Sequence, residues 1–154
     1  MLYYSYVITH KITYFKLRLI IVKGGKMSYD RQAKVVTDLF IRSSGGSEAT
    51  LIIPPPKDPF TGRPLGEATS QPVYAVTAKY SREDIANPSL ANGLLKVLIA
   101  PLYEGNPVPN LIDIVENKES KITLPNNKTY SIRYVTPTQP DAVTPLLVSI
   151  FVGA

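Results

Sequence analysis

One stretch near the start of the chain repeats its apolar residues at helical spacing: YDRQAKVVTDLFIRSSGG, which begins at Tyr29. Four of its apolar residues would fall on one face of a helix: Val35, Val36, Leu39 and Phe40. Ser28 is a good N-cap because its hydroxyl can accept a hydrogen bond from a first-turn N–H, and Gly45-Gly46 supplies a stop. The pattern predicts one amphipathic helix from about Tyr29 to Arg42 that packs on a core, with an exposed docking helix as the alternative.

After this helix the pattern changes to short alternating or apolar runs, which are typical of strands. PVYAVTAKYS alternates two sets of side chains, which indicates a half-buried strand. LLKVLIAPL is continuously apolar around Val97 to Ile99, which indicates a central strand. Asn126 and Asn127 suit a tight hairpin turn, because Asn tolerates a positive φ. Further runs are EATLIIPPP, NLIDIVEN, SKITLPNNKTYSIRYVTP and PLLVSIFVGA.

One helix followed by about six strands in meander order indicates a mainly β fold, a small antiparallel β-barrel or sandwich with one N-terminal helix. NLIDIVEN is not predicted to be a helix. With 154 residues, 44% of them hydrophobic and 19% charged, the chain has the composition of one folded domain. Its 14 prolines favour strands joined by rigid loops over long helices.

Two connections are long and polar. KDPFTGRPLGEATSQP has no periodicity and is rich in turn formers, so we expect a long loop. Within it Arg63 could bind a phosphate or a partner carboxylate, or it could simply be solvated. REDIANPSLANG is a polar bridge with room for one helical turn, and its Arg82, Glu83 and Asp84 are interpreted as a solvated face.

The first 26 residues differ from the rest in charge. Five of the 17 basic residues and none of the 12 acidic ones precede Met27, so the remaining chain carries 12 of each and is formally neutral. The longest apolar run, Leu19 to Val22, is far shorter than the ~20 residues of a membrane-spanning helix, and no secretory signal pattern is present. Neither a membrane partner nor a strongly basic binding surface on the domain is therefore expected.

Two interpretations of this leader stay open. It could be a β-arm that adds to a sheet edge, since Tyr, Ile, Val and Thr favour extended structure. Alternatively, Lys-Gly-Gly-Lys-Met can be encoded as AAA GGA GGA AAA ATG, which contains a purine-rich ribosome-binding sequence before an ATG. On that interpretation translation starts at Met27 and the domain is residues 27–154. We favour the second, because it explains the Gly-Gly pair and the charge asymmetry together.

The sequence offers little for catalysis. It has no cysteine, and its single histidine, His10, lies in the leader, so a thiolate metal site and a histidine-dependent triad are both excluded. The carboxylate pairs Glu83-Asp84 and Asp113/Glu116 have no histidine, no lysine in a pocket-like pattern and no phosphate-binding loop beside them, and no glycine-rich turn forms a P-loop. We therefore expect a protein that is not an enzyme and that binds no cofactor or metal.

A small barrel can also bind single-stranded nucleic acid in the manner of an oligonucleotide-binding fold. Five tyrosines could stack on bases: Tyr74, Tyr80, Tyr103, Tyr130 and Tyr134. Tyrosines that alternate along strands also pack across strands, and a neutral domain lacks the usual basic groove. A barrel that binds single strands or a peptide is therefore the alternative function.

The order of these features resembles the head-closure proteins of long-tailed bacteriophages and prophages, also called head-tail adaptor or head-completion proteins. The resemblance rests on the leading helix and on TLIIPPPKDPFTGRP, PVYAVTAKYS, GLLKVLIAPL and NKTYSIRYVTPTQPDAVTPLLVSIFV. In that family a strand similar to "kvLIap" is followed by a polar turn, a strand similar to "g-K-x-Y-x-I/V", a proline-bearing turn and a last apolar strand. Lys96 to Ala100 fill the first place, and Lys128, Tyr130 and Ile132 fill the second. The match spans roughly Met27 to Ala154.

The resemblance implies a structural virion protein, a β-barrel that assembles as a homo-oligomeric ring at the neck. Such a ring joins head and tail, retains the packaged DNA beside it, and contacts the portal or adaptor ring and the tail proteins. Its location would be the virion, and the host cytoplasm during assembly; which neck ring it forms stays open. The expected contact loops run from Lys57 to Thr69 and from Ser81 to Asn92. Eight residues in them are candidates for protein contacts: Lys57, Asp58, Pro59, Phe60, Arg63, Arg82, Glu83 and Asp84.

Overall fold

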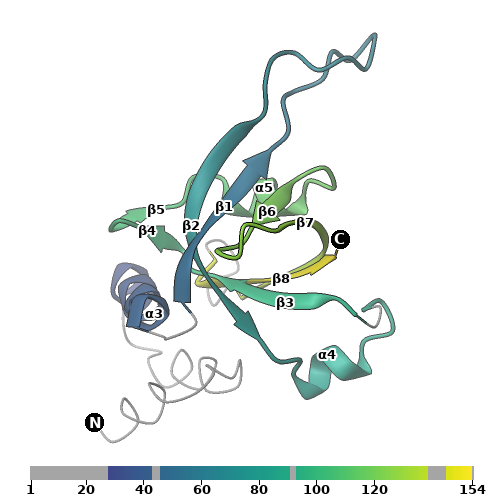
Figure 1. Cartoon of the computed structure of the whole chain (residues 1–154). Coiled ribbons are helices and arrows are strands. Elements are labelled where there is room, and N and C mark those ends of the chain that lie inside the picture. The colour runs from purple at the N-terminus through teal and green to yellow at the C-terminus, as the bar shows by residue number, and fades with distance from the viewer. Residues whose placement is uncertain (1–27, 43–45, 91–92, 139–144, 154) are drawn as a thin grey trace, which may run out of the picture.

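The computed structural model describes residues 28–42, 46–90, 93–138 and 145–153. The leader and the proposed start at Met27 lie outside these residues. Six strands close into an antiparallel barrel (Figure 1), which confirms the predicted mainly β fold. In chain order they are β1 (Gly46–Ile53), β2 (Thr69–Ala78), β3 (Leu95–Ile99), β6 (Lys121–Thr123), β7 (Thr129–Thr138) and β8 (Leu147–Gly153).

The strand order differs from the predicted meander. Around the barrel the order is β1-β2-β3-β8-β7-β6, and β6 closes on β1. The last strand of the chain therefore lies between β3 and β7. All but the last residue of β8 are buried, as expected for a strand with a neighbour on each side and packed side chains on both faces.

Two apolar clusters hold the fold together. One fills the barrel with alternate residues of its strands, among them Leu51, Val97, Ile99 and Ile150. The other lies outside the barrel, where α3 (Tyr29–Arg42) packs its Val36 and Phe40 onto outward-facing residues such as Leu98 of β3. The predicted helix is confirmed with its predicted bounds, and it packs on a core.

Two short helices accompany the predicted N-terminal helix among the described residues. The bridge after β2 contains α4 (Arg82–Ala86), the single helical turn for which the sequence left room. NLIDIVEN contains α5 (Leu111–Glu116), whose Leu111, Ile114 and Val115 join the barrel cluster. The connection from β3 to β6 also holds a small hairpin of β4 (Leu102–Tyr103) and β5 (Asn106–Pro107).

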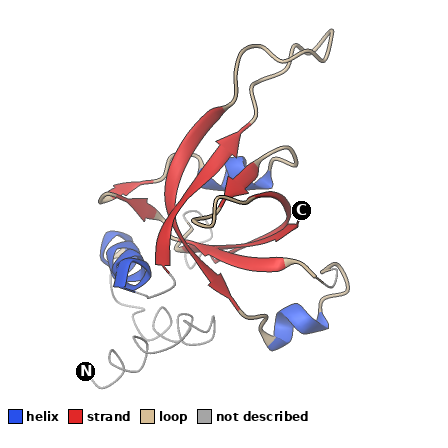
Figure 2. Cartoon of the chain, in the orientation of Figure 1, coloured by secondary structure: helices blue, strands red, loops and turns tan. Residues whose placement is uncertain are grey.

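Two predicted turns position the strands. Asn127 has a φ of 61° between β6 and β7, as expected of the Asn-Asn turn. The connection between β1 and β2, residues 54–68, projects well beyond the barrel as a long arm (Figures 1 and 2).

Candidate protein-contact site

The far end of the β1–β2 connection is an ordered turn, which we call the arm tip and define as residues 56–65. An isolated β-bridge joins Lys57 and Pro64. The Asp58 N–H donates to the Arg63 carbonyl at 2.8 Å, and the Leu65 N–H donates to the Pro56 carbonyl at 2.7 Å. The predicted long loop is therefore a hairpin extension whose end holds itself together.

The Asp-Pro-Phe-Thr-Gly sequence explains this turn. The Asp58 carboxylate accepts hydrogen bonds from the Phe60 N–H and from the Thr61 hydroxyl, each at 2.8 Å. These bonds, the Phe60 amide first, lower the pKa of Asp58 below its ordinary value. Gly62 has a φ of 69°, a conformation that side chains with a Cβ rarely adopt. Asp58 therefore serves the turn rather than a partner.

The arm tip presents an aromatic ring and a cation to solvent. Phe60 is 95% exposed, and Leu65 and Arg63 are exposed as well. Lys57 forms an ion pair with Glu119, which lies just before β6, so its charge is already matched. Of the five candidates in this loop, Phe60 and Arg63 are thus the side chains best placed to contact a partner.

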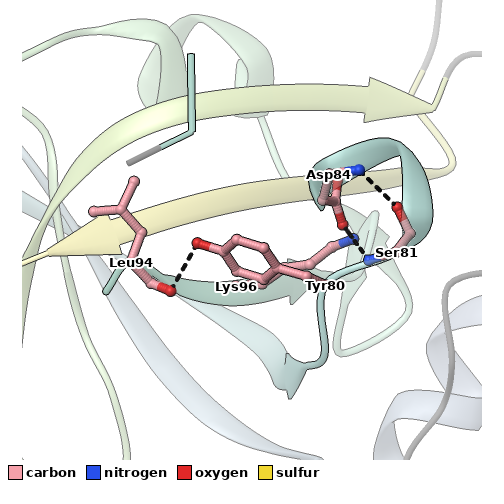
Figure 3. A network of polar contacts seen from close by, with 5 residues as sticks. All are labelled: Tyr80, Ser81, Asp84, Leu94 and Lys96. Carbon is pink, nitrogen blue, oxygen red and sulfur yellow. Dashed lines mark hydrogen bonds and ion pairs between the residues drawn. The ribbon is translucent and has the colours of Figure 1, made fainter. Parts of the chain in front are cut away.

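The second candidate region is the bridge after β2. It is anchored by the Asp84 carboxylate, which the sequence analysis predicted to be solvated. Asp84 points back to the barrel wall and forms an ion pair with Lys96 of β3 (Figure 3). The Lys96 side chain is 1% exposed and that of Asp84 is 15% exposed. The prediction of a solvated face was therefore wrong for Asp84, whereas Arg82 and Glu83 are exposed.

A capping box fixes the Asp84 carboxylate in this position. The Asp84 N–H donates to the Ser81 hydroxyl at 3.1 Å, and the Ser81 N–H donates to the Asp84 carboxylate at 2.7 Å. Burial raises the pKa of Asp84, but the Lys96 ion pair and the Ser81 hydrogen bonds outweigh it and hold the pKa below its ordinary value. Asp84 is therefore charged at neutral pH and neutralises Lys96.

Aromatic rings surround the Lys96 side chain. Its Nζ lies 5.6 Å from the centre of the Phe151 ring, and Tyr80 packs edge-on against that ring with centroids 5.4 Å apart. The Tyr80 hydroxyl donates to the Leu94 carbonyl at 2.9 Å (Figure 3). The pKa of Tyr80 is raised, mainly by burial of its hydroxyl and to a smaller extent by the nearby Asp84 charge. This network fixes α4 to the barrel and leaves Ile85 exposed on its outer side.

The five tyrosines considered for base stacking already have partners. Tyr80 and Tyr134 both pack on Phe151. Tyr74 and Tyr103 pack on each other with ring centroids 4.9 Å apart, and the Tyr103 hydroxyl donates to Glu48 at 3.0 Å. That bond, together with burial, raises the pKa of Tyr103 to about 12. Tyr130 packs against the barrel cluster.

One surface feature escaped the sequence analysis. A hollow of about 370 Å³ lies between α3 and the β4–β5 hairpin, with Tyr74 and Leu102 among its lining residues. Asp30, Asp38 and Glu104 also line it, against a single basic residue, Lys34. The turn-forming Glu104-Gly105 was an available signal for the hairpin, but its packing beside α3 joins segments far apart in the sequence.

The described residues contain no group of three or more His, Cys, Asp or Glu side chains that could hold a metal ion. Within the same residues, no helix is long and apolar enough to cross a membrane. Searches against protein-family models, curated proteins and solved structures found no match to the chain.

Proposed function

We propose that this chain is a structural subunit of the neck of a tailed phage or prophage, where copies form a ring that joins the head to the tail. The observation that carries the proposal is the arm. A closed barrel supports a turn that is held by hydrogen bonds within the arm tip. This turn exposes Phe60 and Arg63 far from the barrel core. A subunit that builds a ring needs such a rigid surface for contacts with its neighbours.

Three of the segments that resemble the head-closure family are neighbours in the barrel. GLLKVLIAPL contains β3, NKTYSIRY contains most of β7, and LLVSIFV contains most of β8. These three strands lie side by side in the order β3-β8-β7. This part of the resemblance therefore forms one continuous half of the barrel wall, which supports the proposal of a shared architecture.

The proposed partners follow from this role. The ring would contact the portal or adaptor ring on the head side and tail proteins on the other side, with packaged DNA beside it. The protein would be in the host cytoplasm during assembly and in the virion neck afterwards. A barrel that binds single strands is the weaker alternative, because its stacking tyrosines are engaged in packing within the chain.

Localising the chain in purified particles tests the proposal. We expect gold-labelled antibodies against the chain to mark the junction between head and tail in electron micrographs, once tails are partly detached to open the neck. Particles treated with pre-immune serum are the control. Label on the capsid face or the tail tip would refute the neck assignment. Unlabelled particles in which mass spectrometry also detects no copy of the chain would refute it as well.

A further inference from the structure

The arm tip offers a contact that is already organised. Its turn is held by the Asp58 side chain and by cross-strand backbone bonds. Docking it would therefore cost little conformational entropy. A phenylalanine that is 95% exposed on such a rigid support is a typical anchor for a pocket on another molecule.

The hollow beside α3 offers a complementary surface. Ile41 lines it and is 53% exposed, so apolar area remains to be covered there. Thr37 also lines it; this residue is 4% exposed, and its hydroxyl has no hydrogen-bond partner among the described residues. A buried hydroxyl without a partner is costly, which indicates that a polar atom of an occupant completes the site.

The charges of the two surfaces are opposite. Three carboxylates against one lysine make the hollow acidic: Asp30, Asp38 and Glu104 against Lys34. The guanidinium of Arg63 has no ion pair among the described residues, and it lies three positions from Phe60 at the same turn. A ring that enters the apolar part of the hollow would bring Arg63 near these carboxylates.

The two surfaces cannot meet within one chain. Figure 1 shows the arm and α3 at opposite ends of the molecule. A contact between two different surfaces of identical subunits is heterologous, and it builds a ring when the rotation closes. Both halves of the contact are present on this chain, which points to a second copy as the occupant.

We infer that the arm tip of one copy docks into the hollow between α3 and the β4–β5 hairpin of the next copy, with Phe60 in the hollow and Arg63 against its carboxylates. This inference deepens the proposed function and rests on it, because it supplies the contact by which neighbouring subunits of the ring recognise each other. A single tip in a hollow is a small interface, so isolated copies associate weakly and ring closure strengthens the assembly.

Site-directed photo-cross-linking of the full chain tests the contact even when association is weak. A benzophenone amino acid replaces Phe60, and purified protein is irradiated up to its highest soluble concentration. We expect covalent dimers whose cross-linked peptide comes from α3 or from residues 102–107. The same probe at the exposed Glu67, outside the arm tip, is the matched control and should give much less dimer.

Charge exchange then tests the pairing. In the probe-bearing chain, Arg63→Glu should lower the dimer yield roughly fivefold, because repulsion replaces attraction. Adding Asp38→Lys to the same chain should restore it, since the acidic tip then meets a more basic hollow. Circular dichroism of each variant confirms that the barrel is folded.

The outcomes separate this inference from the proposed function. Rings that form while the probe at Phe60 gives no cross-link to the hollow would overturn the docking and leave the neck assignment standing. Dimers whose cross-linked peptides lie only outside α3 and residues 102–107 would overturn the hollow as the docking site. If the expected cross-link forms but intact particles assemble without this chain, the docking is supported and the neck function is rejected.

Discussion

At the residue scale, the ion pair of Lys96 and Asp84 is the most unusual feature of this small barrel. Lys96 stands on the outward face of a fully paired strand and is buried beneath α4 and aromatic rings. A buried ammonium group is stable in such a place only with a charged partner. In this chain Lys96 therefore has a structural role.

We expect Asp84→Asn to lower the free energy of unfolding by about 3 kcal/mol, because it leaves the Lys96 charge buried without its carboxylate. Arg82→Gln, two residues away and exposed, is the matched control and should change stability by less than about 0.5 kcal/mol. Urea unfolding followed by circular dichroism measures both variants. Equal stability of the two variants would contradict the assigned role of the pair.

The same pair has a defined pH dependence. The pKa of Asp84 is lowered in the folded state, so the unfolded chain, in which the pKa of an Asp is about 3.9, takes up the proton first as pH falls. The contribution of the pair is therefore full above that value and is lost as pH falls through the folded pKa. The stability difference between wild type and Asp84→Asn should shrink between about pH 6 and about pH 3. A difference that stays constant over this range would show that Asp84 does not act through its charge.

At the element scale, the arm is a hairpin extension whose order depends on one carboxylate. Backbone bonds pair its two sides, and Asp58 closes the turn from within. The barrel packs without it, because none of residues 54–68 belongs to either apolar cluster. The order of the tip is therefore separable from the stability of the fold.

We expect Asp58→Ala to loosen the arm tip without unfolding the barrel. Amide hydrogen exchange measured by NMR should accelerate at Phe60, which loses its acceptor, and at Gly62 in the same turn. Amides of β3 and β8 should keep their protection. Glu67→Ala is the control, and unchanged exchange at Phe60 in Asp58→Ala would contradict the turn described for this arm.

Local features could be read from the sequence, and features made by distant segments could not. The bounds of α3 were predictable because its apolar face, its N-cap Ser28 and the Gly45-Gly46 pair after it all lie within one short segment of the sequence. The helix α5 was missed because six residues are too few for a convincing period, although Leu111, Ile114 and Val115 have helical spacing. The partner of Asp84 was missed because Lys96 lies in an apolar run that indicated only a strand.

At the scale of the whole molecule, strand order was the main error, because hydrophobic patterns identify strands but not their neighbours. The position of β8 between β3 and β7 makes Lys96 of β3 and Phe151 of β8 cross-strand neighbours in the barrel wall. The arm projects at one end of the resulting body, and α3, which lines the hollow, lies well away from it (Figure 1). A molecule of this shape suits head-to-tail assembly of copies.

The most direct test of the neck assignment is to delete the gene in an inducible prophage that carries it, induce, and count particles by electron microscopy. We expect heads and tails to accumulate unjoined, and the wild-type gene supplied in trans to restore whole particles. Intact, infectious particles formed without the gene would contradict the proposed function.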